Sequence, residues 1–320
     1  MAMRLASRVW LGHDGSTMTH RISPRLAAAL SITAAMVLTG SNVPFGKAIV
    51  GEIPIYLFLP LRFAVACLAL APLAARESGP RLSQTTPGQR RDIFAMSLLG
   101  MVGYTIFILE GLKRTSASDA GIITATIPAV VALMGVAFAG DRLSRRQMAA
   151  VGLAVAGLAL IQGFAASTGA RTLAGNLLVG GAVLCEASFV VLGKRLAPPF
   201  RPFRLSLGAN LVGLVLSIPL AAIDARGFEP SSVQWATWVL SVWYALSASV
   251  ICLWLWYRGL PYVETWMAGL ATAAIPVSAL LVSALYLREA IGWPQLAGAA
   301  LVIAAIVVGA RSAQRTPPPG

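Results

Sequence analysis

One acidic residue lies deep in an apolar stretch of this sequence. Glu186 comes about twelve residues into the run 174–193, whose other side chains are nearly all small or apolar. If this run crosses a bilayer, an ionised carboxylate there costs several kcal/mol unless it is paired or reached by water, so functional use is the first expectation. Glu186 would take up a proton in exchange for a solute, or pair with a solute's ammonium group. The alternative is a structural role, in which a protonated or hydrogen-bonded carboxyl group holds two helices together.

The second charge well inside an apolar run is Arg62, in the segment 54–75. We expect a structural role, in which the guanidinium group bonds backbone carbonyls or a helix C-terminus, or extends its charge to the membrane surface. Pairing with Glu186 stays open, because the sequence does not say whether the two segments are neighbours.

Two prolines, Pro128 and Pro276, stand at equivalent places in two apolar segments. Each removes a backbone hydrogen bond and is expected to kink its helix. Thr124 and Thr272 lie one turn before them, where their hydroxyl groups would bind a solute or hydrogen-bond to the freed carbonyls. The pairs predict hinges or a polar cavity lining, although proline is also frequent in membrane helices that have neither role.

Further polar groups occur at repeat-matched places, with Ser41 and Asn42 in the first apolar segment and Ser188 in the sixth. These side chains would either face a polar cavity or hydrogen-bond between helices, and the sequence leaves both interpretations open.

Aromatic side chains offer a surface for an apolar or aromatic solute. Tyr104, Tyr244 and Trp254 are the candidates that would face inward and act by stacking or by cation–π contact. The competing interpretation is that such residues anchor helices at the membrane surface, as expected of aromatic residues near the ends of spans.

The composition of the chain indicates that these residues lie in a membrane and not in water. The chain of 320 residues is 57% hydrophobic and 12% charged, with a mean hydropathy of +0.76, whereas a soluble domain carries roughly 25% charged residues. The length allows about ten membrane-spanning helices of roughly 20 residues, so we expect an all-α membrane protein. The apolar segments fall at about 26–48, 54–75, 93–112, 118–139, 147–166, 174–193, 205–223, 235–256, 263–287 and 292–310.

Charge predicts the orientation of these spans. Most of the 25 Lys and Arg residues fall in alternate connections and in the two tails, so the positive-inside rule places both termini in the cytoplasm. The net charge of +13 then reflects basic loops that hold the topology and contact anionic lipid. We expect no nucleic-acid partner, because the sequence has no basic groove with interleaved aromatic residues. We expect a disordered tail at 1–25, which a start at Met18 would shorten, and a C-terminal tail at 311–320.

The second half repeats the first at an offset of 148 residues, as Gly111-Leu112 against Gly259-Leu260 illustrates. We therefore expect two domains of five helices each, at 26–166 and 174–310. An odd number of spans makes the second half enter the membrane from the opposite side, so the halves are predicted to be inverted. Inverted repeats suit alternating access, in which a site between the halves opens to either face.

The run GIITATIPAVVALMGVAFAGDRL and its partner GLATAAIPVSALLVSALYLREA resemble the EamA-type repeat of the drug/metabolite transporter superfamily. So do GSNVPFGK with LRF in the first half and EASFVVLGKRL in the second. The resemblance implies a ten-helix inner-membrane carrier that exports amino acids, related metabolites or drugs from a central cavity. One departure is Cys185-Glu186, where the family commonly has Trp beside the small residue, so coupling and solute can differ.

These features predict a secondary transporter rather than an enzyme. The two histidines, His13 and His20, lie in the tail, and the sequence has no phosphate-binding GxxxxGK[ST] loop. The three cysteines lie inside apolar runs, so we expect no metal and no cofactor. The expected partners are a small-molecule solute, membrane lipid, protons and a second copy of the chain, the last suggested by small residues such as Ala300 and Ala304. Import, or a membrane scaffold that transports nothing, remain alternatives.

Overall fold

A computed structural model describes residues 23–115, 117–163, 172–286, 288 and 291–313, and this part of the chain is built from helices. The N-terminal tail predicted at 1–25 falls almost wholly outside the described residues, as does most of the C-terminal tail. The α-helices are α1 (Pro24–Ser41), α2 (Val43–Val50), α3 (Ile55–Arg76), α4 (Pro87–Ser97), α5 (Tyr104–Leu112), α6 (Ala117–Thr124), α7 (Ile127–Met134), α8 (Arg145–Gly163), α9 (Leu173–Leu196), α10 (Pro202–Asp224), α11 (Trp235–Leu246), α12 (Cys252–Gly259), α13 (Thr265–Thr272), α14 (Ala274–Tyr286) and α15 (Trp293–Ala313).

Nine helical segments of the described chain are long and apolar enough to cross a membrane. Several of them join shorter helices end to end, as α1 joins α2 and α11 joins α12. The expected fifth span corresponds to α8, a helix of 19 residues that is not among the nine. The protein is therefore an integral membrane protein with an all-helical fold.

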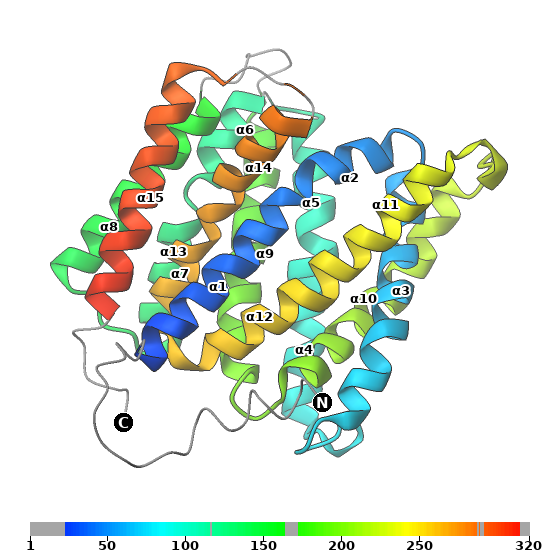
Figure 1. Ribbon diagram of the computed structural model, residues 1–320, viewed down its shortest axis with the longest axis horizontal. Helices are drawn as coiled ribbons and strands as arrows, with labels where there is room; N and C mark the ends of the chain where they lie inside the picture. The colour runs from blue at the N-terminus through cyan, green and yellow to red at the C-terminus, as the bar shows by residue number, and fades with distance from the viewer. Residues whose placement is uncertain (1–22, 116, 164–171, 287, 289–290, 314–320) are drawn as a thin grey trace, which may run out of the picture.

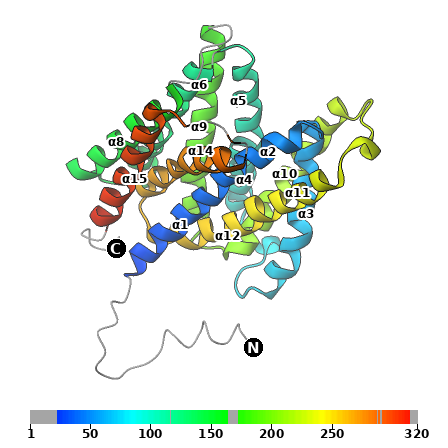
Figure 2. The ribbon, with the colours of Figure 1, turned by 45° about the horizontal axis from the view of Figure 1, so that its top comes forward.

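The helices form one bundle with α1 and α9 near its middle (Figures 1 and 2). In both views α8 and α15 lie side by side along one flank, and α3, α10 and α11 lie along the other. The first helix, α1, packs against α12 and α14, and α9 packs in the corresponding way against α5 and α7. The main core includes the large buried side chains of Trp256, Tyr257 and Trp266.

Three of the membrane segments are interrupted just before a proline. The breaks lie between α1 and α2, between α6 and α7, and between α13 and α14, and they precede Pro44, Pro128 and Pro276. Proline has no N–H to continue the helical ladder and clashes with the preceding turn. At Pro128 and Pro276 the expected kinks are short interruptions of the helix, in which Thr126 and Ala273 keep right-handed helical backbone angles, and the two interruptions fall at equivalent places in the two halves.

Wider helical turns also recur at matched places. A π-helical stretch at Leu98–Gly103 joins α4 to α5, and another at Ser247–Ile251 joins α11 to α12. Such stretches insert an extra residue into a helix and often mark functional positions. They allow the two halves of each span to present different faces.

The pair α3 and α10 is held together by a reciprocal exchange of carboxylate caps. Asp224 Oδ2, at the end of α10, accepts a hydrogen bond from Tyr56 N at the start of α3, at 3.1 Å. Glu77, directly after α3, accepts hydrogen bonds from Phe203 N at 3.1 Å and from Arg204 N at 3.0 Å. Each acid satisfies free N–H groups at the other helix's N-terminus, so the two helices run antiparallel.

Close packing of α8 against α15 depends on glycine. A Cβ atom at Gly157 would lie 2.7 Å from the carbonyl oxygen of Gly298, and one at Gly298 would lie 2.5 Å from the carbonyl oxygen of Gly157. Ala300 and Ala304, which suggested a second copy of the chain, are exposed on α15. The two helices therefore pack through Gly157 and Gly298, on a face of α15 other than that of Ala300 and Ala304.

Candidate functional site

A central cavity of about 500 Å³ lies between the two halves of the chain. The first half contributes residues of α1, α2 and α5 to α8, and the second contributes residues of α9, α13 and α14. Six of the residues proposed from the sequence line it: Tyr104, Thr124, Pro128, Glu186, Thr272 and Pro276. The other described lining residues are Thr39, Val43, Ile108, Leu112, Ala120, Gly121, Ile127, Leu158, Gln162 and Ile275.

Glu186 brings the carboxylate to this cavity. It lies on α9, which continues unbroken for 24 residues through the middle of the bundle. Its neighbours Cys185 and Ala187 are buried in the packed interior. Within the described residues, no hydrogen bond or ion pair joins the Glu186 carboxyl group to another side chain, so this group is available to a solute or a proton.

The matched threonines stand where the broken helices meet the cavity. Because Pro128 and Pro276 have no N–H, the carbonyls of Thr124 and Thr272 lack the usual partner four residues later. The Thr272 hydroxyl group donates to the carbonyl of Gly269 at 2.7 Å. It therefore does not supply the hydrogen bond that the Thr272 carbonyl has lost. Each half therefore has, at a residue that lines the cavity, a carbonyl group to which the following proline cannot donate a hydrogen bond.

Two polar lining residues, Gln162 and Thr39, were missed by the sequence analysis. Gln162 Oε1 lies 2.9 Å from Thr124 Oγ1, and Thr39 Oγ1 lies 2.9 Å from Cys252 Sγ. Gln162 could have been found as an amide near the end of an otherwise apolar run. Thr39 offered no such signal, because threonine is common in membrane helices.

Arg62 is not a lining residue of the cavity and does not pair with Glu186. Its guanidinium carbon lies 4.8 Å from the ring centroid of Phe63 and 5.7 Å from that of Tyr244. Nε of Arg62 is buried without a hydrogen-bond partner among the described residues. The expected bonds to backbone carbonyls are therefore replaced by contact with aromatic ring faces, an interaction favourable for a guanidinium group.

The two serines and the asparagine proposed in the first and sixth spans do not line the cavity. Ser41 Oγ donates to the carbonyl of Leu38 at 2.7 Å, and Ser188 Oγ donates to that of Leu184 at 2.7 Å. Asn42 is 1% exposed and accepts a hydrogen bond from Ser247 Oγ at 2.9 Å. The alternative of interhelical hydrogen bonding thus describes Asn42, whereas both serines bond within their own helices.

Two of the three proposed aromatic residues lie away from the cavity. Tyr244 packs edge-on against Phe58, with ring centroids 5.3 Å apart. Trp254 stacks on Phe203 at 6.1 Å, and the guanidinium group of Arg258 lies 5.2 Å from its ring centroid. Among the described lining residues of the cavity, Tyr104 is the one aromatic residue.

Beyond one end of the cavity, contacts between the halves close the bundle. Asp141 Oδ2 accepts hydrogen bonds from Thr265 N at 2.7 Å and from Trp266 N at 3.3 Å, and so caps α13. Both capped residues are fully buried. Next to them, Gln147 Nε2 donates to Glu264 Oε2 at 3.4 Å, and Lys194 Nζ donates to the carbonyl of Val263. We call this group the Asp141 cluster.

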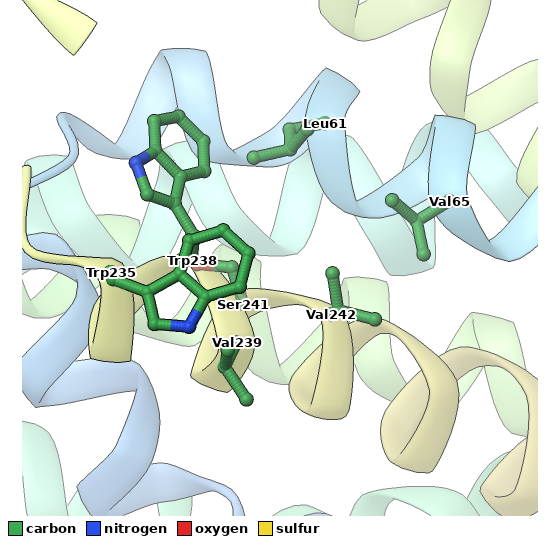
Figure 3. A pocket seen from close by; sticks show the side chains of 7 residues that line it. All are labelled: Leu61, Val65, Trp235, Trp238, Val239, Ser241 and Val242. Carbon is green, nitrogen blue, oxygen red and sulfur yellow. The ribbon is translucent and has the colours of Figure 1, made fainter. Parts of the chain in front are cut away.

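A second hollow, of about 410 Å³, lies between α3 and α11 (Figure 3). It is lined by Leu61, Val65, Trp235, Trp238, Val239, Ser241 and Val242. Ser241 Oγ already donates to the carbonyl of Thr237 at 2.7 Å. Trp235, Val239 and Val242 are exposed on the outer surface of the bundle, so this hollow opens outward, and its lining is almost wholly apolar.

Comparison with known proteins shows the family to which this chain belongs. The sequence profile of the EamA-like transporter family matches residues 26–163 and 173–310. The chain is 30% identical to "Uncharacterized transporter YetK" of Bacillus subtilis, over 90% of this chain and 88% of that protein. It is 26% identical to "Probable terminal-alkyne amino-acid exporter" of Streptantibioticus cattleyicolor, over 77% of this chain and 81% of that protein.

A further relative is "Aromatic amino acid exporter YddG" of Ancylobacter novellus, 23% identical over 85% of this chain and 92% of that protein. A solved crystal structure shares the fold, with a TM-score of 0.72 and 21% identity, covering 91% of this chain and 99% of the other. Because the family profile matches both halves of the chain, the protein belongs to the EamA-like transporter family.

Proposed function

We propose that this protein exports small organic solutes by alternating access through the cavity that contains Glu186. The observation that carries the proposal is the composition of this cavity, in which the matched Thr124–Pro128 and Thr272–Pro276 pairs meet the carboxylate of α9. Energy would come from a proton gradient, with Glu186 as the group that exchanges a proton for the solute.

We propose that α8 is a tenth span and that the two halves are inverted repeats. At about 1.5 Å per residue, its 19 residues reach roughly 28 Å, close to the thickness of a bilayer core. The antiparallel pair α3 and α10 supports inversion, because these helices occupy equivalent places in the two halves. Matched breaks and matched π-helical stretches add to this support. The homodimer stays a prediction.

Alternating access needs one face closed while the other is open. With both termini in the cytoplasm, as the positive-inside rule predicts, the Asp141 cluster lies on the cytoplasmic side of the cavity. We propose that the Asp141 cluster holds the cytoplasmic side closed, so that the cavity opens to the outside. The inward-open state would require α13 to leave Asp141.

The test is counterflow in liposomes that contain the purified protein, with pooled radiolabelled amino acids and amphipathic cations. We expect uptake of at least one compound, and faster flux when a pH gradient is imposed. A complete absence of flux would favour the membrane scaffold over a carrier. Flux that runs inward in cells along the same gradient would favour import.

The broken helices predict a change in turnover. Pro128→Ala and Pro276→Ala restore a backbone N–H and permit a continuous helix, so we expect a several-fold lower maximal rate with little change in half-saturation. The initial rate of counterflow against solute concentration measures both quantities. Pro219→Ala in the unbroken helix α10 is the control. Wild-type rates in all three variants would show that Pro128 and Pro276 do not act as hinges.

The Asp141 cluster predicts a shift between the two states. Asp141→Ala leaves two buried N–H groups of α13 without their carboxylate, which costs about 1 kcal/mol for a lost cap, or roughly a fivefold change in the equilibrium. We expect faster labelling of Thr272→Cys by an impermeant thiol reagent from the cytoplasmic side, measured in inside-out vesicles after replacement of the native cysteines.

Asp141→Asn retains an acceptor oxygen and should label at an intermediate rate. If the alanine variant labels no faster than the parent, Asp141 is only a static cap and does not hold the cytoplasmic side closed.

A further inference from the structure

The described lining residues of the central cavity carry negative charge only. Among its described lining residues, Glu186 supplies a carboxylate, and none is lysine, arginine or histidine. A solute with a single positive charge would neutralise this carboxylate. A solute with a carboxylate group of its own would place a second negative charge beside the first, where few groups can compensate it.

The other polar groups of the lining favour the same kind of solute. The carbonyls of Thr124 and Thr272 are acceptors left open by Pro128 and Pro276. An ammonium group has three N–H donors and no acceptor, so it can use these carbonyls together with the Glu186 carboxylate. The lining side chains that can donate hydrogen bonds, such as Tyr104 and Gln162, are uncharged.

The membrane-embedded cation Arg62 does not balance this arrangement. It is absent from the lining of the cavity, and its guanidinium group lies over the rings of Phe63 and Tyr244. A carboxylate group bound beside Glu186 would therefore find no cationic partner among the described lining residues, although a buried anion requires one.

The rest of the lining is apolar. Side chains such as Val43, Ile108, Leu112 and Leu158 form its wall, together with the ring of Tyr104. A volume of about 500 Å³ falls within the range of roughly 300–1,000 Å³ found for small-molecule sites. An apolar or aromatic body fits this wall better than a sugar or a nucleotide does.

We propose that the solute of this carrier is an amine that joins one ammonium group to an apolar or aromatic body and has no free carboxylate group. The inference rests on the proposed function, since it names the class of solute for the same cavity. It separates this chain from the relatives that are named as amino-acid exporters, because a free amino acid carries both charges.

Calorimetric titration of the purified full-length protein tests the preference with three probes that share a phenyl ring: 2-phenylethylamine, L-phenylalanine and 3-phenylpropionate. We expect the amine to bind at least about 10-fold more tightly than phenylalanine, since an unpaired buried charge costs more than the 1.4 kcal/mol that corresponds to a factor of ten. 3-Phenylpropionate should bind most weakly.

Substitutions locate the preference. Glu186→Gln should remove the advantage of the amine, and Glu186→Asp should retain it. Glu110→Gln is the matched control, because Glu110 pairs with Lys113 and Arg114 at 2.6 Å and is not a lining residue. The proposal is overturned if phenylalanine binds as tightly as the amine, if the amine does not bind, or if Glu186→Gln keeps the advantage.

Counterflow of the same probes reports the proposed function separately. An amine that binds but is not carried would overturn transport and leave the binding preference intact. Phenylalanine carried in preference to the amine would leave transport intact and overturn the class of solute.

Discussion

Replacing Glu186 by glutamine is expected to abolish the dependence of transport on pH while the protein stays folded. In the proposed cycle the outward-open carrier takes a proton from outside onto Glu186 and releases the solute, so acidifying the outside accelerates export. Glutamine has nearly the same shape but cannot ionise. Loss of one partner of a buried charge pair typically costs about 2–5 kcal/mol, so solute affinity should also fall by at least about 10-fold.

Efflux from preloaded liposomes at several external pH values measures this effect. The wild-type rate should rise as the external pH falls, and the rate of Glu186→Gln should be flat. Glu186→Asp keeps a titratable group and should keep the dependence. An unchanged pH response in the glutamine variant, with an unchanged melting temperature, would reduce Glu186 to a structural residue.

The second large effect is expected in stability, from Gly157→Leu. A Cβ at this position would lie 2.7 Å from the Gly298 carbonyl oxygen and 3.0 Å from Val302 N. Both are backbone atoms of α15, which cannot yield unless the two helices separate. Overpacking of this kind costs about 1–3 kcal/mol, so the melting temperature of the purified protein in detergent should fall clearly.

Gly152 provides the matched control on the same helix, because a Cβ there would meet no atom within 4 Å. Gly152→Leu should leave the melting temperature unchanged or raise it slightly, since glycine is unfavourable inside a helix. Equal melting temperatures for the two variants would mean that α8 and α15 do not pack as closely as described.

Local patterns predicted most of the fold. Apolar runs longer than a bilayer is thick can only become helices that satisfy their own backbone hydrogen bonds, and nine such segments occur in the described chain. The repeat predicted equivalent places in the two halves, and the helix breaks before Pro128 and Pro276 occur at such places. The weakest segment was α8, where Arg145 and Arg146 begin a helix of 19 residues.

The composition of the site could be predicted only in part. Glu186, Tyr104 and the threonine–proline pairs do line one cavity. Gln162 joins them from α8 without having been proposed, and Asn42 instead bonds Ser247. Hydrogen bonds within a helix, such as those of the two serines, are as consistent with the sequence as a role in a cavity.

The sequence by itself determined that this protein lies in a membrane, where its spans fall and that its two halves repeat. It also determined which few charged residues cost so much free energy inside a bilayer that a function is expected of them. Only the tertiary structure decided which face of each helix meets the cavity, so that Glu186 faces it and Arg62 lies among aromatic rings. The reason is physical. In a bilayer the lipid-facing surface and the packed interior are both apolar, so hydropathy does not mark the inward face of a helix. That face depends on close fits such as Gly157 against Gly298, which link residues far apart in the chain.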